Sequence, residues 1–600
     1  MLPYQEKYIN NIKEIETILD ERKTAASDFG TWCEEQKRLT ARLDELKEEN
    51  NRLLKDNLFP VLDSLFGAGP ETIRELEEFS DVIMDWRTNL DCGVYVVIHD
   101  ALLSLYKYRK DRDGIIKELY KLGMGLYYLR RAVEAVPGEG SRSIMFRNEL
   151  VFTEAGSYMR YFDDIDNEET RGYIIRALAN ISLCTPDHKR KIATSKRVLD
   201  IINDEHYREL APGLPWDVFL RRTHQQMSAN RTELTDGNLS KDELAYVLDS
   251  CYEVFKPEEV SDNPSARWLW PYYEMEYNLG YVDINMTLNR MERLSGGAEY
   301  NQYDMSGLYA NVQIPIYYGT LLRENPDLRK DPHRIGFYGI AVEKMFRTLF
   351  TCPGEYIDDY FYYLVDLVIS SYYETEGLPL YSEIIPRLLK RFRPRLYTRS
   401  RRVGAIISEI AQDILKDDPG FFDDIPFIRE IGDPEKKKEA VIKFSKECGL
   451  YQDFGMVKMN IGRTMNIRDF FENEFEIYQL HTVSGYEDLK ARESTVKYAD
   501  IALGHHRWYD GSGGYPQEYV RNDSPMRQMT DISAIAMELV LNYRGDLDGL
   551  MDEIIRGGGS QFSPVVTAYL GDEDLRKRIG ELLVRDSEEL YKEIYQELIS

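Results

Sequence analysis

The stretch LGHHRWYDGSGGYP, at positions 503 to 516, places two adjacent histidines before an Asp-Gly turn and a Gly-Gly-Tyr-Pro sequence. A further histidine, His481, lies upstream, and the chain contains only eight histidines in all. Imidazole and carboxylate groups suit Fe, Mn or Zn, and two bridged cations lower the pKa of a shared water enough for it to attack a phosphodiester. The pattern supports two interpretations, a metal site or ordinary core histidines beside a glycine-rich turn.

Four motifs around these histidines follow one another along the chain: YQDFGMVKMN (451 to 460), YQLHTVSGYEDL (478 to 489), HHRWYDGSGGYP (505 to 516) and MRQMTDISAIAMEL (526 to 539). A fifth stretch, RGGGSQFSPVVTAYL (556 to 570), comes after them. In order and approximate spacing they resemble the motifs of the HD-GYP family, a branch of the HD phosphohydrolases associated with hydrolysis of cyclic di-GMP. The resemblance covers about residues 390 to 575 and implies a bacterial signalling protein.

The resemblance implies a role for particular residues of this chain. Its metal-ligand positions correspond to Asp453, His481, His505, His506 and Asp531. The positions that it places beside the substrate correspond to Arg399, Arg402, Asp510 and Tyr515. The assignment of Asp531 to the last carboxylate position is ambiguous, because Met537 also aligns with that position. If Met537 is the true match, this metal ligand is lost. If the site is active, Asp453 and Asp531 are its candidate catalytic residues.

The chain also departs from the family pattern. Gln452 replaces a histidine by an amide, a poorer ligand, and Arg399 replaces an earlier histidine by a guanidinium that cannot deprotonate to bind metal. Met456 replaces a lysine that faces the substrate phosphate, and Arg507 replaces a glutamate after the histidine pair. These changes predict a degenerate site that holds one divalent ion, Fe, Mn or Zn, and does not cleave a diester.

The elements that position these residues are predicted to be helices throughout. Residues 386–600 are expected to form the degenerate HD-GYP helical bundle. Residues 66–385 keep a helical period broken by Pro and Gly and show almost no alternating strand pattern. Their weak resemblance to tetratricopeptide repeats predicts an irregular array of antiparallel helix pairs that binds a protein partner. The predicted fold class is therefore all-α.

Residues 1–65 contain a short, mostly apolar seam. It is formed by residues that recur at alternating spacings of four and three, namely Leu39, Leu43, Leu46, Asn50 and Leu53. One interpretation is a coiled coil that forms a homodimer, with Asn50 setting the register. The other, which we favour, is an amphipathic hairpin that packs on its own chain, because a confident coiled coil needs at least ~3 heptads.

A basic run at positions 387 to 402 contains eight Arg or Lys residues and no acid. It is typical of a solvated helix face that balances acidic neighbours. The alternative is a patch that binds phosphate, because one guanidinium group can donate hydrogen bonds to two phosphate oxygens at once.

Composition limits the possible partners and location. The chain has 76 basic and 104 acidic residues, a net charge of -28, which disfavours polymeric nucleic acid and anionic membranes as partners. The six cysteines are scattered, and the first residues lack the apolar segment of a signal peptide. No stretch approaches the ~18 apolar residues of a spanning helix. These features predict a cytoplasmic protein, and 600 residues predict more than one domain.

Three functions fit these patterns. The first, which we favour, is a cytosolic signalling protein whose degenerate HD-GYP domain binds cyclic di-GMP or a protein without hydrolysis. The second is a metal-dependent phosphodiesterase that acts on cyclic di-GMP or a related nucleotide through an altered site and loses activity on His505→Ala. The third is a scaffold whose carboxyl-terminal domain only covers the open end of the helical array.

Overall fold

The computed structural model describes residues 1–599 apart from 23–27, 85–88, 131–135, 137, 230–238, 260–265, 298–304, 352–364, 366, 376, 458, 460 and 585–587. Within this described part every regular element is a helix, and strand-like pairing is limited to isolated bridges. The all-α prediction is confirmed. None of the described helices combines the length and apolarity that a membrane-spanning helix requires.

The amino-terminal seam is covered by its own chain. Helices α1 (Pro3–Glu21) and α2 (Phe29–Leu53) pack together, and Asp28 caps α2 by accepting a hydrogen bond from the Thr31 backbone at 2.9 Å. The seam residues Leu39, Leu43, Leu46 and Asn50 are buried. The Asn50 side chain accepts a hydrogen bond of 2.9 Å from Asn11 on α1. This is the arrangement of the amphipathic hairpin, with Asn50 bonded to a helix of the same chain.

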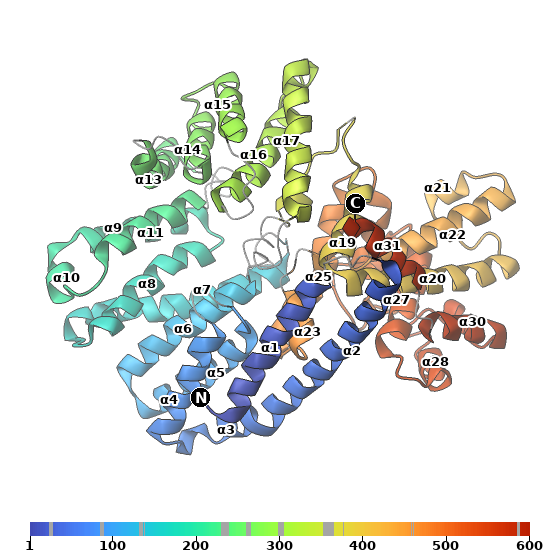
Figure 1. Ribbon diagram of the computed structural model, residues 1–600, viewed down its shortest axis with the longest axis horizontal. Helices are drawn as coiled ribbons and strands as arrows, with labels where there is room; N and C mark the ends of the chain where they lie inside the picture. The colour runs from blue at the N-terminus through green and yellow to red at the C-terminus, as the bar shows by residue number, and fades with distance from the viewer. Residues whose placement is uncertain are drawn as a thin grey trace.

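A long series of helices follows the hairpin. It comprises α3 (Phe59–Asp63), α4 (Pro70–Ile83), α5 (Cys92–Arg109), α6 (Arg112–Arg130), α7 (Glu139–Ser157), α8 (Glu168–Cys184), α9 (His188–Asn203), α10 (Glu205–Leu210), α11 (Trp216–Ala229), α13 (Lys241–Glu259), α14 (Ala266–Asn278), α15 (Ile284–Gly297), α16 (Met305–Glu324) and α17 (Pro332–Thr351). Successive helices from α4 to α9 pack on one another, and the sequence continues through α11, α13 and α14 to α17. Figure 1 shows them following one another around one side of the molecule.

The carboxyl-terminal helices form a second group. They are α19 (Tyr381–Phe392), α20 (Pro394–Asp417), α21 (Pro426–Arg429), α22 (Pro434–Tyr451), α23 (Ile461–Ile467), α24 (Glu472–Gln479), α25 (His481–Lys490), α26 (Ala499–Gly504), α27 (Arg527–Asn542), α28 (Leu547–Arg556), α29 (Pro564–Tyr569), α30 (Glu573–Val584) and α31 (Glu588–Ile599). Helices α20 and α22 approach each other closely, because a Cβ atom on Gly449 would lie 2.1 Å from the backbone nitrogen of Gly404. This contact fixes α20 and α22 against each other.

The amino-terminal hairpin contacts the last helix of the chain. Trp32 at the start of α2 packs against Tyr591 and Tyr595 on α31, with ring centroids 6.1 and 5.5 Å apart. Figure 1 shows α2 running alongside the carboxyl-terminal group. Buried residues of the carboxyl-terminal group, among them Met456 and Tyr478, also belong to the same apolar core as helices α1 to α11. Met456 and Tyr478 therefore lie in a core that both groups share.

The basic run is largely balanced by acidic groups from distant parts of the chain. Arg387 pairs with Glu597 at 2.8 Å, and Arg395 pairs with Asp44 at 2.6 Å. Arg401 pairs with Glu593 at 3.2 Å. These pairs favour the charge-balancing interpretation of the run over a patch that faces phosphate along its whole length.

Candidate metal centre

Three short connections carry the candidate ligands. Asp453 lies just after α22, His481 is the first residue of α25, and the pair His505 and His506 follows the last turn of α26. Gly455 allows the first two connections to touch, because a Cβ atom there would lie 2.1 Å from the carbonyl oxygen of His481. The backbone approach thus brings Asp453 beside the start of α25.

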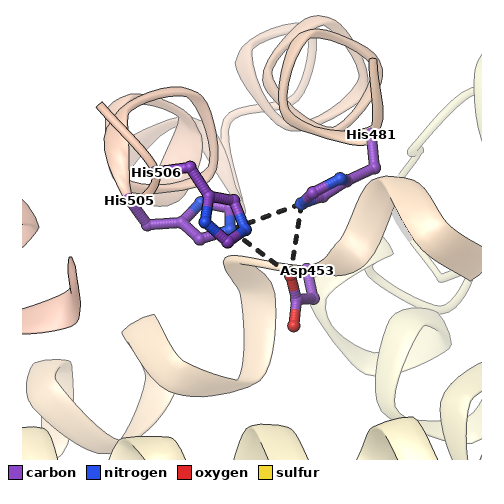
Figure 2. Close-up of side chains that lie close together, drawn as sticks. All are labelled: Asp453, His481, His505 and His506. Atoms are coloured by element: carbon purple, nitrogen blue, oxygen red, sulfur yellow. Dashed lines mark hydrogen bonds and ion pairs between the residues drawn. The ribbon is translucent and has the colours of Figure 1, made fainter. Parts of the chain in front are cut away.

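The four side chains converge on one point, as Figure 2 shows. Oδ1 of Asp453 lies 3.3 Å from Nε2 of His481 and 3.3 Å from Nε2 of His505. The two Nε2 atoms are 3.4 Å apart. One ligand atom of each of the four residues, His506 included, lies within 4.8 Å of the others. Three imidazoles and one carboxylate are a donor set suited to Zn, Fe or Mn.

Hydrogen bonds behind the rings fix which nitrogen faces the centre. Nδ1 of His481 donates to the Tyr478 carbonyl at 2.6 Å, and Nδ1 of His505 donates to the Ala502 carbonyl at 3.0 Å. With their protons on Nδ1, both rings direct the Nε2 lone pair inwards, as in metal-binding histidines. Within the described part of the chain, Nε2 of His506 and Oδ1 of Asp453 are buried and make no hydrogen bond. These directed acceptors fit a cation.

The electrostatics of the centre keep its groups ready to bind a cation. Burial alone would raise the pKa of Asp453, but the Arg399 guanidinium holds that pKa well below its usual range. Burial lowers the pKa of His481, and burial together with the neighbouring histidines lowers the pKa of His506 still further. At neutral pH the carboxylate is therefore ionised and these two imidazoles are neutral.

The pH dependence of metal binding follows from these directions. Protonation of an imidazole competes with a metal ion, and a lowered pKa moves that competition to a lower pH. We expect the affinity for Zn²⁺ to stay constant as the pH falls from 8 to about 6.5, the ordinary pKa of histidine, and to decline only below it. Calorimetric titration across this range measures the effect. An affinity that already falls tenfold between pH 8 and 7 would contradict it.

Arg399 lies on the other side of Asp453. Its Nη2 donates to Oδ2 at 2.8 Å, whereas the histidines face Oδ1. The side chain of Asp453 is 1% exposed and that of Arg399 is 17% exposed, so the pair is screened from solvent. The carboxylate is thus shared between a guanidinium on one oxygen and an imidazole cluster on the other.

Asp531 is not a member of the ligand group. It forms a two-pronged ion pair with Arg521, at 2.8 Å to Nε and 2.5 Å to Nη2, beside a small cavity lined by Tyr509, Tyr519 and Gln561. The prediction that Asp531 binds the same ion therefore differs from the observed geometry. Met537 lies instead next to a site position, since the Gln452 amide nitrogen is 3.8 Å from its sulfur atom.

The other predicted residues line or support the centre in different ways. The Tyr515 ring stacks on His506 with centroids 4.7 Å apart, while Asp510 lies in an exposed turn and accepts from the Ser512 backbone at 2.8 Å. Arg402 is half-buried on α20, and Met456 is buried in the shared core. The structure thus places Tyr515 at the site and Asp510 in the turn of the same loop.

Two supporting residues were not predicted. Arg507 donates to the carbonyls of Gly513 at 2.8 Å and Gly511 at 2.5 Å, so it holds the loop together. The Tyr478 carbonyl orients His481, and only the spacing of three residues between them hints at that role.

No protein-family model matches the chain, and no curated protein is significantly similar to it in sequence.

Proposed function

We propose that this chain is a cytoplasmic bacterial signalling or interaction protein whose carboxyl-terminal residues form a degenerate HD-GYP domain. In this proposal the domain binds one divalent ion, Fe, Mn or Zn, and acts by binding cyclic di-GMP or a protein. The helices of residues 66–385 provide the surface for a protein partner. The observation that carries the proposal is the division of Asp453 between Arg399 on Oδ2 and the histidines on Oδ1.

The chemistry of Arg399 explains why hydrolysis is not proposed. A two-metal hydrolase holds a water between its cations, which lower the pKa of that water and neutralise the phosphate. A guanidinium supplies positive charge at 2.8 Å from Asp453 but has no coordination site for water. Arg399 can therefore stabilise the carboxylate and attract a phosphate group without helping to generate a hydroxide.

A second candidate function is a mononuclear phosphohydrolase acting on cyclic di-GMP or a related nucleotide. It is favoured by the donor set itself, because a single zinc ion held by three histidines can lower the pKa of its bound water to about 7. The residues available for this are His481, His505 and His506, with Asp453 as a further ligand or a base. This candidate predicts metal-dependent turnover that is lost on His505→Ala.

One set of measurements on a single preparation distinguishes these functions. We expect elemental analysis after metal-replete expression to give about one ion per chain, the content of a mononuclear site. We expect calorimetry to detect binding of cyclic di-GMP and chromatography to show no linear dinucleotide. If calorimetry detects no binding, a protein is the remaining candidate ligand. Two ions per chain, or linear product that accumulates in the wild type and not in His505→Ala, would contradict a non-hydrolytic role. Absence of any ion would refute the metal site.

A further inference from the structure

The helix before His481 connects the metal centre to the amino-terminal helices. Helix α24 (Glu472–Gln479) is eight residues long, and His481 follows it after a single residue. The carbonyl of Tyr478 on α24 accepts the Nδ1 proton of His481 at 2.6 Å. A helix this short has little stability of its own, so contacts with the rest of the chain set its position. The orientation of His481 therefore depends on what holds α24.

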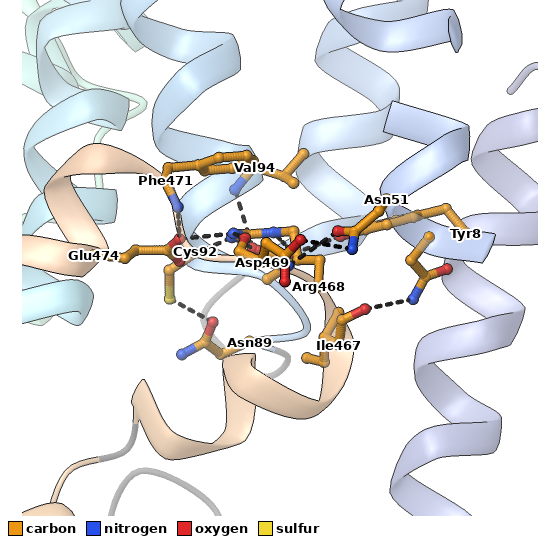
Figure 3. Close-up of polar contacts among 12 residues, drawn as sticks. Tyr8, Asn51, Asn89, Cys92, Val94, Ile467, Arg468, Asp469, Phe471 and Glu474 are labelled. Atoms are coloured by element: carbon orange, nitrogen blue, oxygen red, sulfur yellow. Dashed lines mark hydrogen bonds and ion pairs between the residues drawn. The ribbon is translucent and has the colours of Figure 1, made fainter. Parts of the chain in front are cut away.

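A single buried arginine holds the amino-terminal end of α24, as Figure 3 shows. Arg468 is fully buried and donates two hydrogen bonds to Glu474 on α24, at 2.7 and 2.8 Å. It donates two more to Asp91, at 2.8 and 2.6 Å, and a fifth to the Asp469 carbonyl at 2.8 Å. All five N–H groups of the guanidinium are thus used. The bonded groups come from both ends of the chain.

Asp91 fixes this network to the amino-terminal helices. It is the residue that caps α5, accepting from the Val94 backbone at 3.0 Å, and it also accepts from the Tyr8 hydroxyl of α1 at 2.6 Å. Because both carboxylate oxygens are shared in this way, movement of α1 or α5 would displace Arg468 and Glu474.

Helix α2 contributes a second set of contacts to the same segment. The Asn50 side chain donates to the Ile467 carbonyl at 3.0 Å, and Asn51 exchanges two hydrogen bonds with Asp469, at 2.9 and 3.0 Å. Lys47 pairs with Asp469 at 2.9 Å. Helices α1, α2 and α5 therefore all hold the residues that lead into α24.

We propose that Arg468 is a positioning residue for the metal centre, through which the amino-terminal helices set the orientation of His481 and hence the affinity for metal. This inference rests on the proposed metal site. Removing the partner directly behind a metal-binding histidine, as the Tyr478 carbonyl is behind His481, typically changes metal affinity by about 10- to 100-fold, which sets the upper limit for an effect transmitted by Arg468. By linkage, a partner that shifts α1, α2 or α5 would change metal affinity, and bound metal would change the affinity for that partner by the same factor.

The test compares full-length Arg468→Gln with Arg171→Gln. Arg171 is also a buried arginine, and it donates to the Phe162 carbonyl at 3.0 Å and to the Leu210 carbonyl, within the amino-terminal helices. We expect Arg468→Gln to weaken Zn²⁺ binding by up to about 100-fold in competition with a chromophoric chelator, and Arg171→Gln to leave it unchanged. In metal-free protein with ¹⁵N-labelled histidine, only Arg468→Gln should shift the Nδ1 signal of His481.

A folded Arg468→Gln protein with wild-type zinc affinity and an unshifted His481 signal would overturn the proposal. If this variant does not fold, Arg468→Lys replaces it, because an ammonium keeps the charge but cannot make both paired contacts. Unchanged affinity and an unshifted signal in Arg468→Lys would equally overturn it. A wild-type protein that binds no zinc would refute the metal site instead, and the His481 signal would then still test the positioning role.

Discussion

Replacing Arg399 with glutamine is expected to destabilise the metal-free protein by about 3–5 kcal/mol, the cost of removing one partner of a buried ion pair. Asp453 is 1% exposed, and Arg399 is the nearest cation to it, at 2.8 Å. Without the guanidinium, the buried carboxylate must either remain ionised without a cationic partner or take up a proton. Urea unfolding in the presence of a chelator measures the loss.

Arg401→Gln is the matched control. Arg401 lies two positions away on the same helix and pairs with Glu593 at 3.2 Å, but both side chains are about a third exposed, at 36% and 27%. An exposed pair of this kind contributes roughly 0–1 kcal/mol. Equal losses in the two variants would show that Arg399 has no special role at Asp453.

Metal ions should reverse much of the effect of Arg399→Gln. A cation bound at Oδ1 of Asp453 supplies the charge that the glutamine lacks, and a ligand that binds only the folded state stabilises it in proportion to its affinity. We therefore expect Zn²⁺ to raise the unfolding midpoint more in Arg399→Gln than in the wild type. An equal increase in both proteins would contradict the view that guanidinium and metal ion act on one carboxylate.

The histidine cluster could be predicted from sequence because metal chemistry restricts residue type at each position. Asp453, His481 and the pair His505 and His506 lie in three separate motifs, and the structure brings all four residues together. The last carboxylate could not be assigned, because Asp531 and Met537 lie six residues apart on one helix. At ~100° per residue these side chains point in very different directions, so only the packing of α27 decides which one faces Gln452.

The amino-terminal seam shows a different limit. Burial of Leu39, Leu43 and Leu46 followed from their spacing, but spacing does not say whether the covering helix comes from the same chain. The Arg468 network was outside the reach of sequence analysis altogether. Arg468 and Asp91, which form the central ion pair of this network, are separated by 377 positions in the sequence. No local sequence pattern marks either residue as buried. Such pairs follow from the tertiary fold alone.

Restoring the second half of the site is expected to add a second metal ion. By the family resemblance, ligand positions correspond to Arg399 and Gln452, and the last one corresponds to Asp531 or, in the alternative alignment, to Met537. Arg399 is half-buried, and Gln452 and Met537 are buried. Arg399 contacts Oδ2 of Asp453, and Gln452 contacts Met537. If these three side chains surround one site, histidine at the first two positions and aspartate at the third would add two imidazoles and a carboxylate near Oδ2 of Asp453, which Arg399 contacts in the wild type. That donor set suits Zn, Fe or Mn.

The triple variant Arg399→His, Gln452→His, Met537→Asp, expressed with metal present, should therefore contain about two ions per chain where the wild type contains about one, as in two-metal hydrolases. Arg399→His alone is the control, because one added imidazole cannot complete a second coordination sphere. We expect the triple variant, and not the control, to release linear dinucleotide from cyclic di-GMP. A folded triple variant that still holds a single ion would mean that these three side chains do not surround one site, and that the positions aligned with the family do not meet in space.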